Sequence, residues 1–397
     1  MNELDIRLDD FRWLRNNAAG VGGIALAVCL VGAYFDKQQF FHSYLMAYFF
    51  WLGVPLGCFA IVMIHHLVGG TWGFVIQRPL ESAIRTFPAM ALLFVPLLFG
   101  LPELYLWARP EAVAHDALLQ QKSVYLNLSF FIVRAVIYFV IWISVSFFLT
   151  RWSSEQDRSV DGSLVESLQH LSAPGLVLYG LTVTFSAIDW LMSLEPRWYS
   201  TIYGMIFMVS HGLMALSFVI STTYFLSRQG KFAQVAVPWV FQDLGNLLLS
   251  FIMLWAYLSF CQFLLVWVEN LHQEIPWYLH RTAGGWAAVA LALIILQFAL
   301  PFVLLLSRAV KREAATLCGV AVLIILMHWV EILWFVAPAF HPTQFSISWL
   351  DVLASVAVGG LWLGAFLWNL QERSLLPFGD PRLIATVEEH GLVAKNG

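Results

Sequence analysis

Long apolar runs separated by short polar segments dominate the chain. Each run approaches or exceeds the length of about 20 residues that an α-helix needs to cross the hydrocarbon core of a bilayer. Ten segments qualify, and none shows the period-two alternation of barrel strands. They are residues 19–35, 43–68, 88–107, 124–150, 173–194, 201–227, 244–268, 286–307, 315–337 and 348–370. The pattern predicts an all-α, polytopic membrane protein with a single integral membrane domain over residues 1–397.

The composition agrees with a chain that lies mostly in a membrane. Of its 397 residues, 60% are hydrophobic and 12% are charged, and the mean hydropathy is +0.75. A soluble domain usually carries about 25% charged residues. The net charge of −4 gives no reason to expect a nucleic acid partner. Cys29, Cys58, Cys261 and Cys318 are scattered through apolar runs, which favours neither a disulfide framework nor an iron–sulfur site.

Lysine and arginine are distributed unequally between the two sides of the predicted helices. If the segments alternate in direction, fifteen lie on the side of the N-terminus and five on the other. The fifteen are Arg7, Arg12, Arg15, Arg78, Arg85, Arg151, Arg158, Arg228, Lys231, Arg308, Lys311, Arg312, Arg373, Arg382 and Lys395. The five are Lys37, Arg109, Lys122, Arg197 and Arg281, on a side that is also acidic. Because cytoplasmic loops carry an excess of positive residues, both termini are expected in the cytoplasm.

Five ionisable residues lie inside apolar runs: Arg134, Asp189, His211, His328 and Glu331. A charge at the bilayer centre costs about 2.5–3.5 kcal/mol on insertion scales, so such residues usually face a polar interior that serves protons, ions or a cofactor. With a rise of about 1.5 Å per residue, Arg134 and His211 are expected about 15 Å deep. His328 is expected near the middle of the membrane. Its i, i+3 spacing places Glu331 on the same helix face, one turn nearer the outside.

These residues, with further polar groups at other depths, indicate a route for protons. The outer half holds Asp189, Glu331 and Asp351, the middle holds His211 and His328, the inner end holds His65, His66 and Asp243, and Arg134 and Tyr257 complete the candidates. Histidine, carboxylate and tyrosine groups can each accept and return a proton, so a chain of them can relay one.

The two midplane histidines have other interpretations. His211 and His328 fit hydrogen-bonded packing residues, or two ligands of one haem b. The adjacent His65 and His66 point in different directions on a helix and do not form a second ligand pair. No CxxCH motif is present, so covalently bound haem c is not expected. No intrinsic cofactor or metal is therefore predicted.

Other candidates also have structural alternatives. Arg134 fits a counter-ion of Glu331 or of Asp189. Asp243, immediately before the seventh segment, fits a helix N-cap. Tyr257 fits a packing residue.

Five segments are too particular for generic transmembrane sequence. They are IHHLVGGTWGFVIQRPLE (64–81), SAIDWLMSLEPRWYSTIYG (186–204), DLGNLLLSFIMLWAYLSFCQFLLVWVENLHQEIPWYLHR (243–281), HWVEILWFVAPAF (328–340) and GGLWLGAFLWNL (359–370). The second predicts a tight hairpin in which Trp190 and Trp198 lie at the membrane interface. These segments resemble the NrfD/PsrC family of membrane subunits, and in particular the ActF-type subunits of alternative complex III. The resemblance extends from the second span to the PFGDPRL tail.

The resemblance implies ten helices, eight of them in two four-helix bundles formed by spans two to five and six to nine. It implies a place in the bacterial cytoplasmic membrane, within a respiratory quinol:cytochrome c oxidoreductase. The implied partners are a paralogous ten-helix subunit, an iron–sulfur subunit, multihaem c-type cytochromes and a terminal oxidase. Haem c and iron–sulfur clusters then belong to the partners, and quinol or menaquinol binds in the paralogous subunit or in this one. The chain itself is then not catalytic alone, and its polar interior is a proton route.

One position departs from the family pattern. Many members carry lysine after the DLG of the seventh span, where this chain has Asn246. If that lysine serves a cytoplasmic proton entrance, the charge is lost here.

Two other functions stay open, besides that of a purely structural scaffold. In the first, the chain is itself the quinol-binding subunit, and Asp189, His211 and Glu331 take the protons that a quinol loses. In the second, it is a secondary transporter, a class that favours interrupted helices at mid-depth. Pro55 and Pro96 are the interior interruptions that the sequence suggests.

Overall fold

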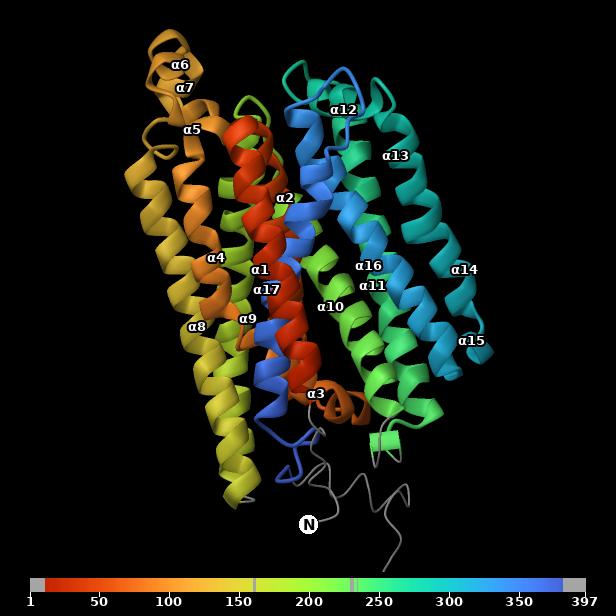
Figure 1. The fold of residues 1–397 in the computed structure, drawn as a ribbon. Helices are drawn as coiled ribbons and strands as arrows, with labels where there is room; N and C mark the ends of the chain where they lie inside the picture. Colours follow the sequence, from red (N-terminus) through yellow and green to blue (C-terminus); the bar gives the residue numbers. More distant parts are fainter. Residues whose placement is uncertain (1–10, 160–161, 229–231, 234, 381–397) are drawn as a thin grey trace, which may run out of the picture.

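The computed structural model describes residues 11–159, 162–228, 232–233 and 235–380 (Figure 1). Their regular structure is helical, with no strand among them. Within this part of the chain, ten helical segments are long and apolar enough to cross a membrane. The all-α, ten-span prediction is therefore confirmed, and the chain is a multi-pass membrane protein.

Most spans are single helices and two are composite. The single ones are α1 (Arg12–Phe35), α2 (Lys37–Val68), α8 (Leu128–Ser159), α9 (Gly162–Trp190), α10 (Tyr203–Ser227), α11 (Pro238–Glu269), α16 (Ala314–Val336) and α17 (Trp349–Gln371). The third span combines α3 (Thr71–Ile84) with α4 (Phe87–Phe99), and the eighth combines α13 (Trp286–Ala292), the π-helix η4 (Leu293–Ala299) and α14 (Leu300–Leu306). The connections include α5 (Leu101–Leu104), η1 (Leu106–Ala108), α6 (Pro110–His115), α7 (Ala117–Lys122), η2 (Met192–Leu194), α12 (Ile275–Thr282), α15 (Arg308–Arg312) and η5 (Ala337–Ala339).

The third span differs from the predicted segment 88–107. The apolar run continues past Gly100, but this residue ends α4, and Pro102 lies in the first turn of the separate helix α5. Before α4, the segment 71–84 forms α3, which crosses the lower end of the view in Figure 1. It contacts α2, α10, α11 and α17 there. A sequence expected to be a polar connection is thus a helix that closes one end of the molecule.

Helices α2 and α10 form the centre of the structure. In the apolar stretch of α2, 89% of the residues are buried inside the protein, and in that of α10 the share is 83%. These are the highest values among the ten spans. Helix α2 contacts α9, α10, α16 and α17. The grouping of eight spans into two four-helix bundles stays a prediction. Helices α2 and α10, which belong to different expected bundles, pack extensively on each other, so the contacts do not separate the two groups.

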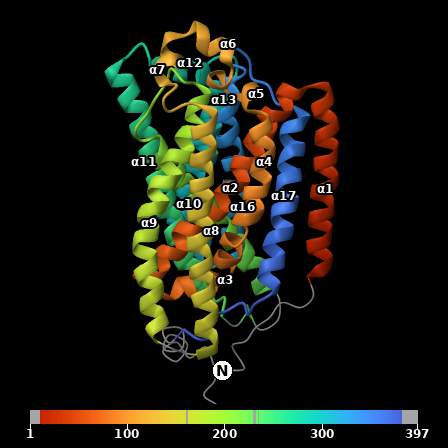
Figure 2. The same cartoon turned by 90° about the vertical axis from the view of Figure 1, so that its left-hand side faces the viewer.

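Helix α1 lies at the edge of the array, beside α17 (Figure 2). The two backbones approach closely: a Cβ atom on Gly360 would lie 2.6 Å from the carbonyl oxygen of Ala18. Only glycine permits this approach, in the manner of small-residue contacts between membrane helices.

The two ends of the helix array differ in charge. The basic end carries α3, where Arg15 stacks on Trp368 at 4.8 Å and Arg85 Nη2 lies 2.8 Å from Glu372 Oε2. The acidic end carries α6, α7 and α12. Helix α1 begins and α17 ends at this basic end (Figures 1 and 2). Four of the counted basic residues lie outside the described part: Arg7, Lys231, Arg382 and Lys395.

A buried ionic network fastens α3 across the basic end. Arg78 Nη1 lies 2.6 Å from Glu81 Oε2, and the same guanidinium pairs with Asp157 of α8. Ser153 Oγ donates to Glu81 Oε1 at 2.6 Å. Arg373, just after α17, donates to the carbonyl of Thr150 at 3.0 Å. These contacts link three spans and indicate that the polar residues of segment 64–81 hold the fold together.

Candidate functional site

Glu331 is the centre of a buried polar cluster. Its side chain is 1% exposed and interacts with four others. Ser210 Oγ and Trp255 Nε1 donate to Oε1 at 2.9 and 2.6 Å. Gln297 Nε2 donates to Oε2 at 3.2 Å, and His328 Nδ1 lies 2.8 Å from the same oxygen. Four partners shared between two oxygens match the acceptor capacity of an ionised carboxylate. We name Glu331, Ser210, Trp255, Gln297, His328 and the adjacent His211 the central cluster.

His328 connects Glu331 with His211. Since Nδ1 of His328 faces the carboxylate, its Nε2 faces away, and this nitrogen forms no hydrogen bond within the described residues. The ring centroids of His328 and His211 lie 6.4 Å apart. Both nitrogens of His211, which is fully buried, also lack a hydrogen bond in this part of the chain. Gly53 of α2 separates the two rings: a Cβ there would lie 2.9 Å from Cδ2 of His211 and 3.4 Å from Nε2 of His328.

Four spans position the cluster, one of them through its π-helix η4. On α16 the i, i+3 spacing brings His328 against Glu331, as predicted. Helix α10 supplies Ser210 and His211, and α11 supplies Trp255. Gln297 lies in η4, whose wider turn re-aims a side chain, and such π-helical turns occur frequently at functional sites.

Arg134 and His211 lie fewer residues from the start of their helices than the predicted segments imply. Helix α8 begins at Leu128 instead of residue 124, because Asn127 Oδ1 accepts from the amide of Phe130 and starts the helix there. Arg134 is therefore about 9 Å from the start of its helix. His211 lies eight residues into α10, or about 12 Å.

Arg134 pairs with Asp189, one of the two partners expected from the sequence. Its Nε and Nη2 donate to the two carboxylate oxygens at 2.7 and 2.9 Å. Tyr138 donates its hydroxyl to Oδ2 of Asp189 at 2.7 Å, and the guanidinium stacks on Tyr125 at 3.9 Å. Asp189 is fully buried. The pair joins α8 to α9, and both its charges are compensated within it.

A second ionic group lies at the acidic end; we name Glu195, His280 and Arg281 the acidic corner. Arg281 Nη1 donates to Oε2 of Glu195 at 2.8 Å, and His280 Nδ1 lies 3.0 Å from Oε1. Burial lowers the pKa of the Arg281 guanidinium, and Glu195 opposes that shift. Trp198 stacks on Trp277 beside it, with ring centroids 4.5 Å apart. Trp198 is therefore buried and does not anchor the chain at the interface.

Trp190 is also buried, at 1% exposure, and it packs on Phe94 and Trp142. It therefore does not face lipid, as an aromatic anchor at the membrane interface would. The hairpin that follows α9 turns inward, so its aromatic residues fill the core beneath the acidic end.

Asp351 holds the start of α17 to α2. Its Oδ1 accepts from Ser43 Oγ at 2.5 Å and from Gln39 at 3.3 Å. Its Oδ2 accepts from the amide of Ser348 at 2.8 Å, which completes a capping box. Asp351 thus lies at the acidic end and has a local role in stabilising that helix start.

His65 and His66 end α2 at the basic end, and both are buried. The His65 ring makes edge contacts with Trp72 and Phe74 of α3. Gly73 lies directly against the same ring, where a Cβ would collide with it. His65 is therefore part of the packing between α2 and α3, and His66 lies beside it, with ring centroids 6.0 Å apart.

The remaining candidates lie away from the central cluster. Asp243 is not an N-cap, because α11 begins at Pro238 after Val237 and a first-turn proline already suits the helix start. Tyr257 is 63% exposed and faces away from the protein interior. Asn246 accepts a hydrogen bond from Lys311 Nζ at 2.8 Å. Asn246 carries no positive charge, but the ammonium group of Lys311 in α15 lies beside it.

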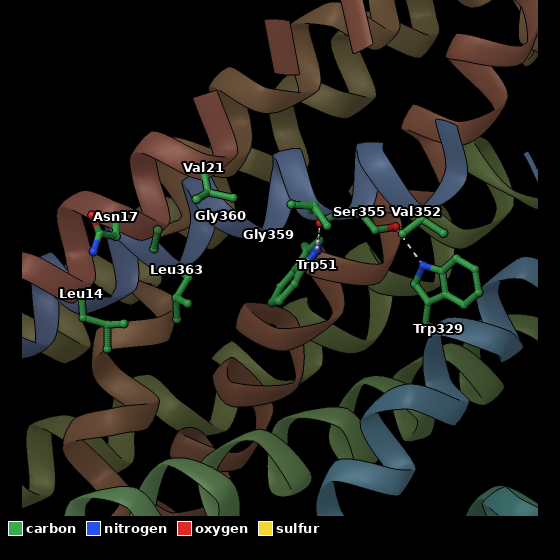
Figure 3. A pocket seen from close by; sticks show the side chains of 12 residues that line it. Leu14, Asn17, Val21, Trp51, Trp329, Val352, Ser355, Gly359, Gly360 and Leu363 are labelled. Atoms are coloured by element: carbon green, nitrogen blue, oxygen red, sulfur yellow. Dashed lines mark hydrogen bonds between the residues drawn. The ribbon is translucent and has the colours of Figure 1, made fainter. Parts of the chain in front are cut away.

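An open apolar groove of about 610 Å³ runs between α1, α2, α16 and α17 (Figure 3). Trp51 and Trp329 form its wall, and their indole nitrogens donate to the carbonyl and the hydroxyl of Ser355, both at 2.8 Å. None of the described residues that line it is ionisable. The groove and the central cluster are therefore separate features.

The sequence alone missed Ser210, Trp255 and Gln297. Gln297 had a visible signal, since it is the only strongly polar residue in the run 286–306. Nothing in the sequence distinguishes Ser210 from other serines of the spans. Trp255 could not be recognised as a polar contact because many other aromatic residues surround it in the sequence.

The structure thus unites three sequence candidates in one cluster, pairs two others, and distributes the rest over the two ends and the surface. The chain matches no protein-family model, and a search of the curated proteins finds no relative for it.

Proposed function

We propose that this chain is a cofactor-free membrane subunit of a bacterial respiratory complex that oxidises quinol, similar to the ActF-type subunits of alternative complex III. In this proposal it conducts protons through the central cluster and anchors its partners. These are a paralogous ten-helix subunit, an iron–sulfur subunit, multihaem c-type cytochromes and a terminal oxidase. The basic end then faces the cytoplasm, as the excess of lysine and arginine suggests.

The observation that supports proton conduction is the contact between Glu331 and His328, with His211 beside it. A buried carboxylate and a histidine 2.8 Å apart can exchange a proton without separating full charges over a long distance. His328 has a second nitrogen that forms no hydrogen bond within the described residues, and the unbonded nitrogens of His211 lie near it.

Quinol oxidation within this chain is the second candidate. A lipid-soluble quinol needs a histidine or carboxylate at a site that it can reach. His211 and Glu331 are 0% and 1% exposed, and Asp189 is already bonded to Arg134. The apolar groove offers access but lacks ionisable residues among those described. These contacts favour proton conduction.

The variant Glu331→Gln tests this function, because it keeps the shape of the side chain and removes its ability to exchange a proton. In vesicles containing the whole complex, we expect fewer protons released per electron, with electron transfer retained when an uncoupler is present. Glu155→Gln, in an exposed pair on α8, is the control. A Glu331→Gln complex with the wild-type proton-to-electron ratio would contradict proton conduction through Glu331. Loss of quinol oxidation even with uncoupler would instead support the second candidate.

The proposed partners are tested by purifying the tagged protein from its native membrane in mild detergent. Haem spectra and mass spectrometry should reveal a multihaem cytochrome c, an iron–sulfur protein and a second ten-helix subunit. A colourless protein that purifies alone would overturn the respiratory assignment.

A further inference from the structure

The packing of α1 on α17 defines the length of the apolar groove. The two helices run in opposite directions, and Gly32 of α1 lies against Leu350 of α17. Val352 is therefore level with about residue 30 of α1, whereas Leu14 lies at the other end of the groove, as Figure 3 shows. At a rise of about 1.5 Å per residue, the groove is about 24 Å long.

The volume of the groove is too small for a further membrane helix. Over the same length of about 24 Å, a helix that is 10–12 Å wide would fill about 2,000 Å³. The groove has a volume of about 610 Å³. A single extended hydrocarbon chain is much narrower than a helix and can follow the groove from end to end. The dimensions therefore favour a hydrocarbon chain over a transmembrane segment of a partner.

The wall of the groove turns its polar groups away from an occupant. Trp51 and Trp329 both donate their indole N–H groups to Ser355, as described above. The hydroxyl of Ser355 donates in turn to the carbonyl of Asp351 at 2.8 Å. Because these hydrogen bonds are made within the wall, an occupant of this part of the groove needs no polar group.

Asn17 lies at the basic end of the groove and differs from the rest of the lining. It is exposed, and its side chain forms no hydrogen bond within the described residues. Trp13, which is 75% exposed, precedes it by one turn, and exposed tryptophans are typical of the headgroup level of a membrane. Asn17 therefore lies about 6 Å inside that level, where its amide can donate to an ester carbonyl.

We propose that the groove binds one acyl chain of a glycerophospholipid from the leaflet at the basic end. The ester group lies beside Asn17, and the chain extends along Trp51 towards Val352 and Trp329. A polar group near the mouth followed by a long apolar channel matches the chemistry of such a lipid. The bound chain fills the space between α1 and α16, where α1 has only 22% of its apolar stretch buried by protein. This binding does not depend on proton conduction.

Photolabelling tests the position and direction of the chain. The probe is phosphatidylglycerol with a diazirine at the end of one acyl chain, in vesicles that contain the full-length protein. After illumination, peptide mapping by mass spectrometry should find the adduct concentrated on Trp329 and Val352. A diazirine placed next to the ester should instead label the segment 14–18. Equal labelling of exposed residues on other spans, such as Val140 and Val303, would overturn the proposal.

The variant Val356→Trp tests the groove itself. Val356 lines it and is 42% exposed, so a larger side chain there fills the groove instead of the core. Val140→Trp is the matched control, because Val140 is 56% exposed on α8, away from the groove. Native mass spectrometry of protein purified in mild detergent should show one retained phospholipid per chain in the wild type and the control, and at least tenfold less in Val356→Trp.

Equal retention in the two variants would overturn the proposal. So would an isoprenoid quinol as the retained molecule, or a diazirine adduct that links the groove to a helix of another subunit. If Val356→Trp does not fold, the labelling of the wild-type protein decides.

Discussion

Replacing Arg134 with leucine removes the charge that compensates Asp189. The guanidinium makes two hydrogen bonds to this carboxylate, at 2.7 and 2.9 Å, and Asp189 is 0% exposed. In Arg134→Leu, the carboxylate retains the hydroxyl of Tyr138 as its partner. An uncompensated buried charge is therefore the main cost of this substitution.

Breaking a buried pair by removing one partner destabilises a protein by about 3–5 kcal/mol. With about 2 °C per kcal/mol for a chain of a few hundred residues, the thermal midpoint should fall by about 6–10 °C. The double variant Arg134→Leu/Asp189→Leu should recover most of this loss, because an apolar pair of similar volume often replaces a buried ion pair without cost. The remaining deficit should be about 1 kcal/mol, from the hydroxyl of Tyr138 that loses its acceptor.

The midpoint is measured on detergent-solubilised protein by the loss of the monomeric peak after heating. Arg151→Leu is the control on the same helix, since its pair with Glu155 is exposed on both sides and contributes about 0.5 kcal/mol or less. An unchanged midpoint in Arg134→Leu would refute the reasoning. So would a double variant less stable than either single variant, because that result would make the pair a net source of stability.

Two further predictions concern close contacts of glycine. Gly53→Ala should slow proton release without changing any charge, because its Cβ would lie 2.9 Å from Cδ2 of His211 and displace that ring; wild-type release by this variant in vesicles would show that the ring position is unimportant. Gly360→Val should detach α1 from α17, because the first added carbon already lies 2.6 Å from the Ala18 carbonyl; a faster cleavage of the N-terminal segment by protease is expected, and an unchanged cleavage rate would contradict the contact.

The sequence predicted all ten spans because long apolar runs are sufficient to identify membrane helices. It could not predict which face of each helix turns inward. In lipid the outer face is as apolar as the inner one, so the periodicity that orients a helix in a soluble protein is absent. Trp255 and Tyr257 illustrate this: two residues apart on α11, one bonds to Glu331 and the other is 63% exposed.

Partner choice was also beyond the sequence. Arg134 had two plausible carboxylates, and only the packing of α8 on α9 selects Asp189 over Glu331. By contrast, His328 and Glu331 were predicted to share a face because three residues separate them on one helix, and the structure places them 2.8 Å apart. Contacts within a helix follow from spacing, whereas contacts between helices require the fold.

The contact between α1 and α17 also bears on how the protein is made. Helix α1 is synthesised before α17, its main partner, and the spans between them are made in the interval. During insertion α1 therefore waits in the lipid without its neighbour while the central helices assemble. The array is closed only when α17 enters the membrane and Gly360 meets Ala18. The contact is thus formed only after the central helices are made, and a chain interrupted before α17 would leave α1 without its main partner.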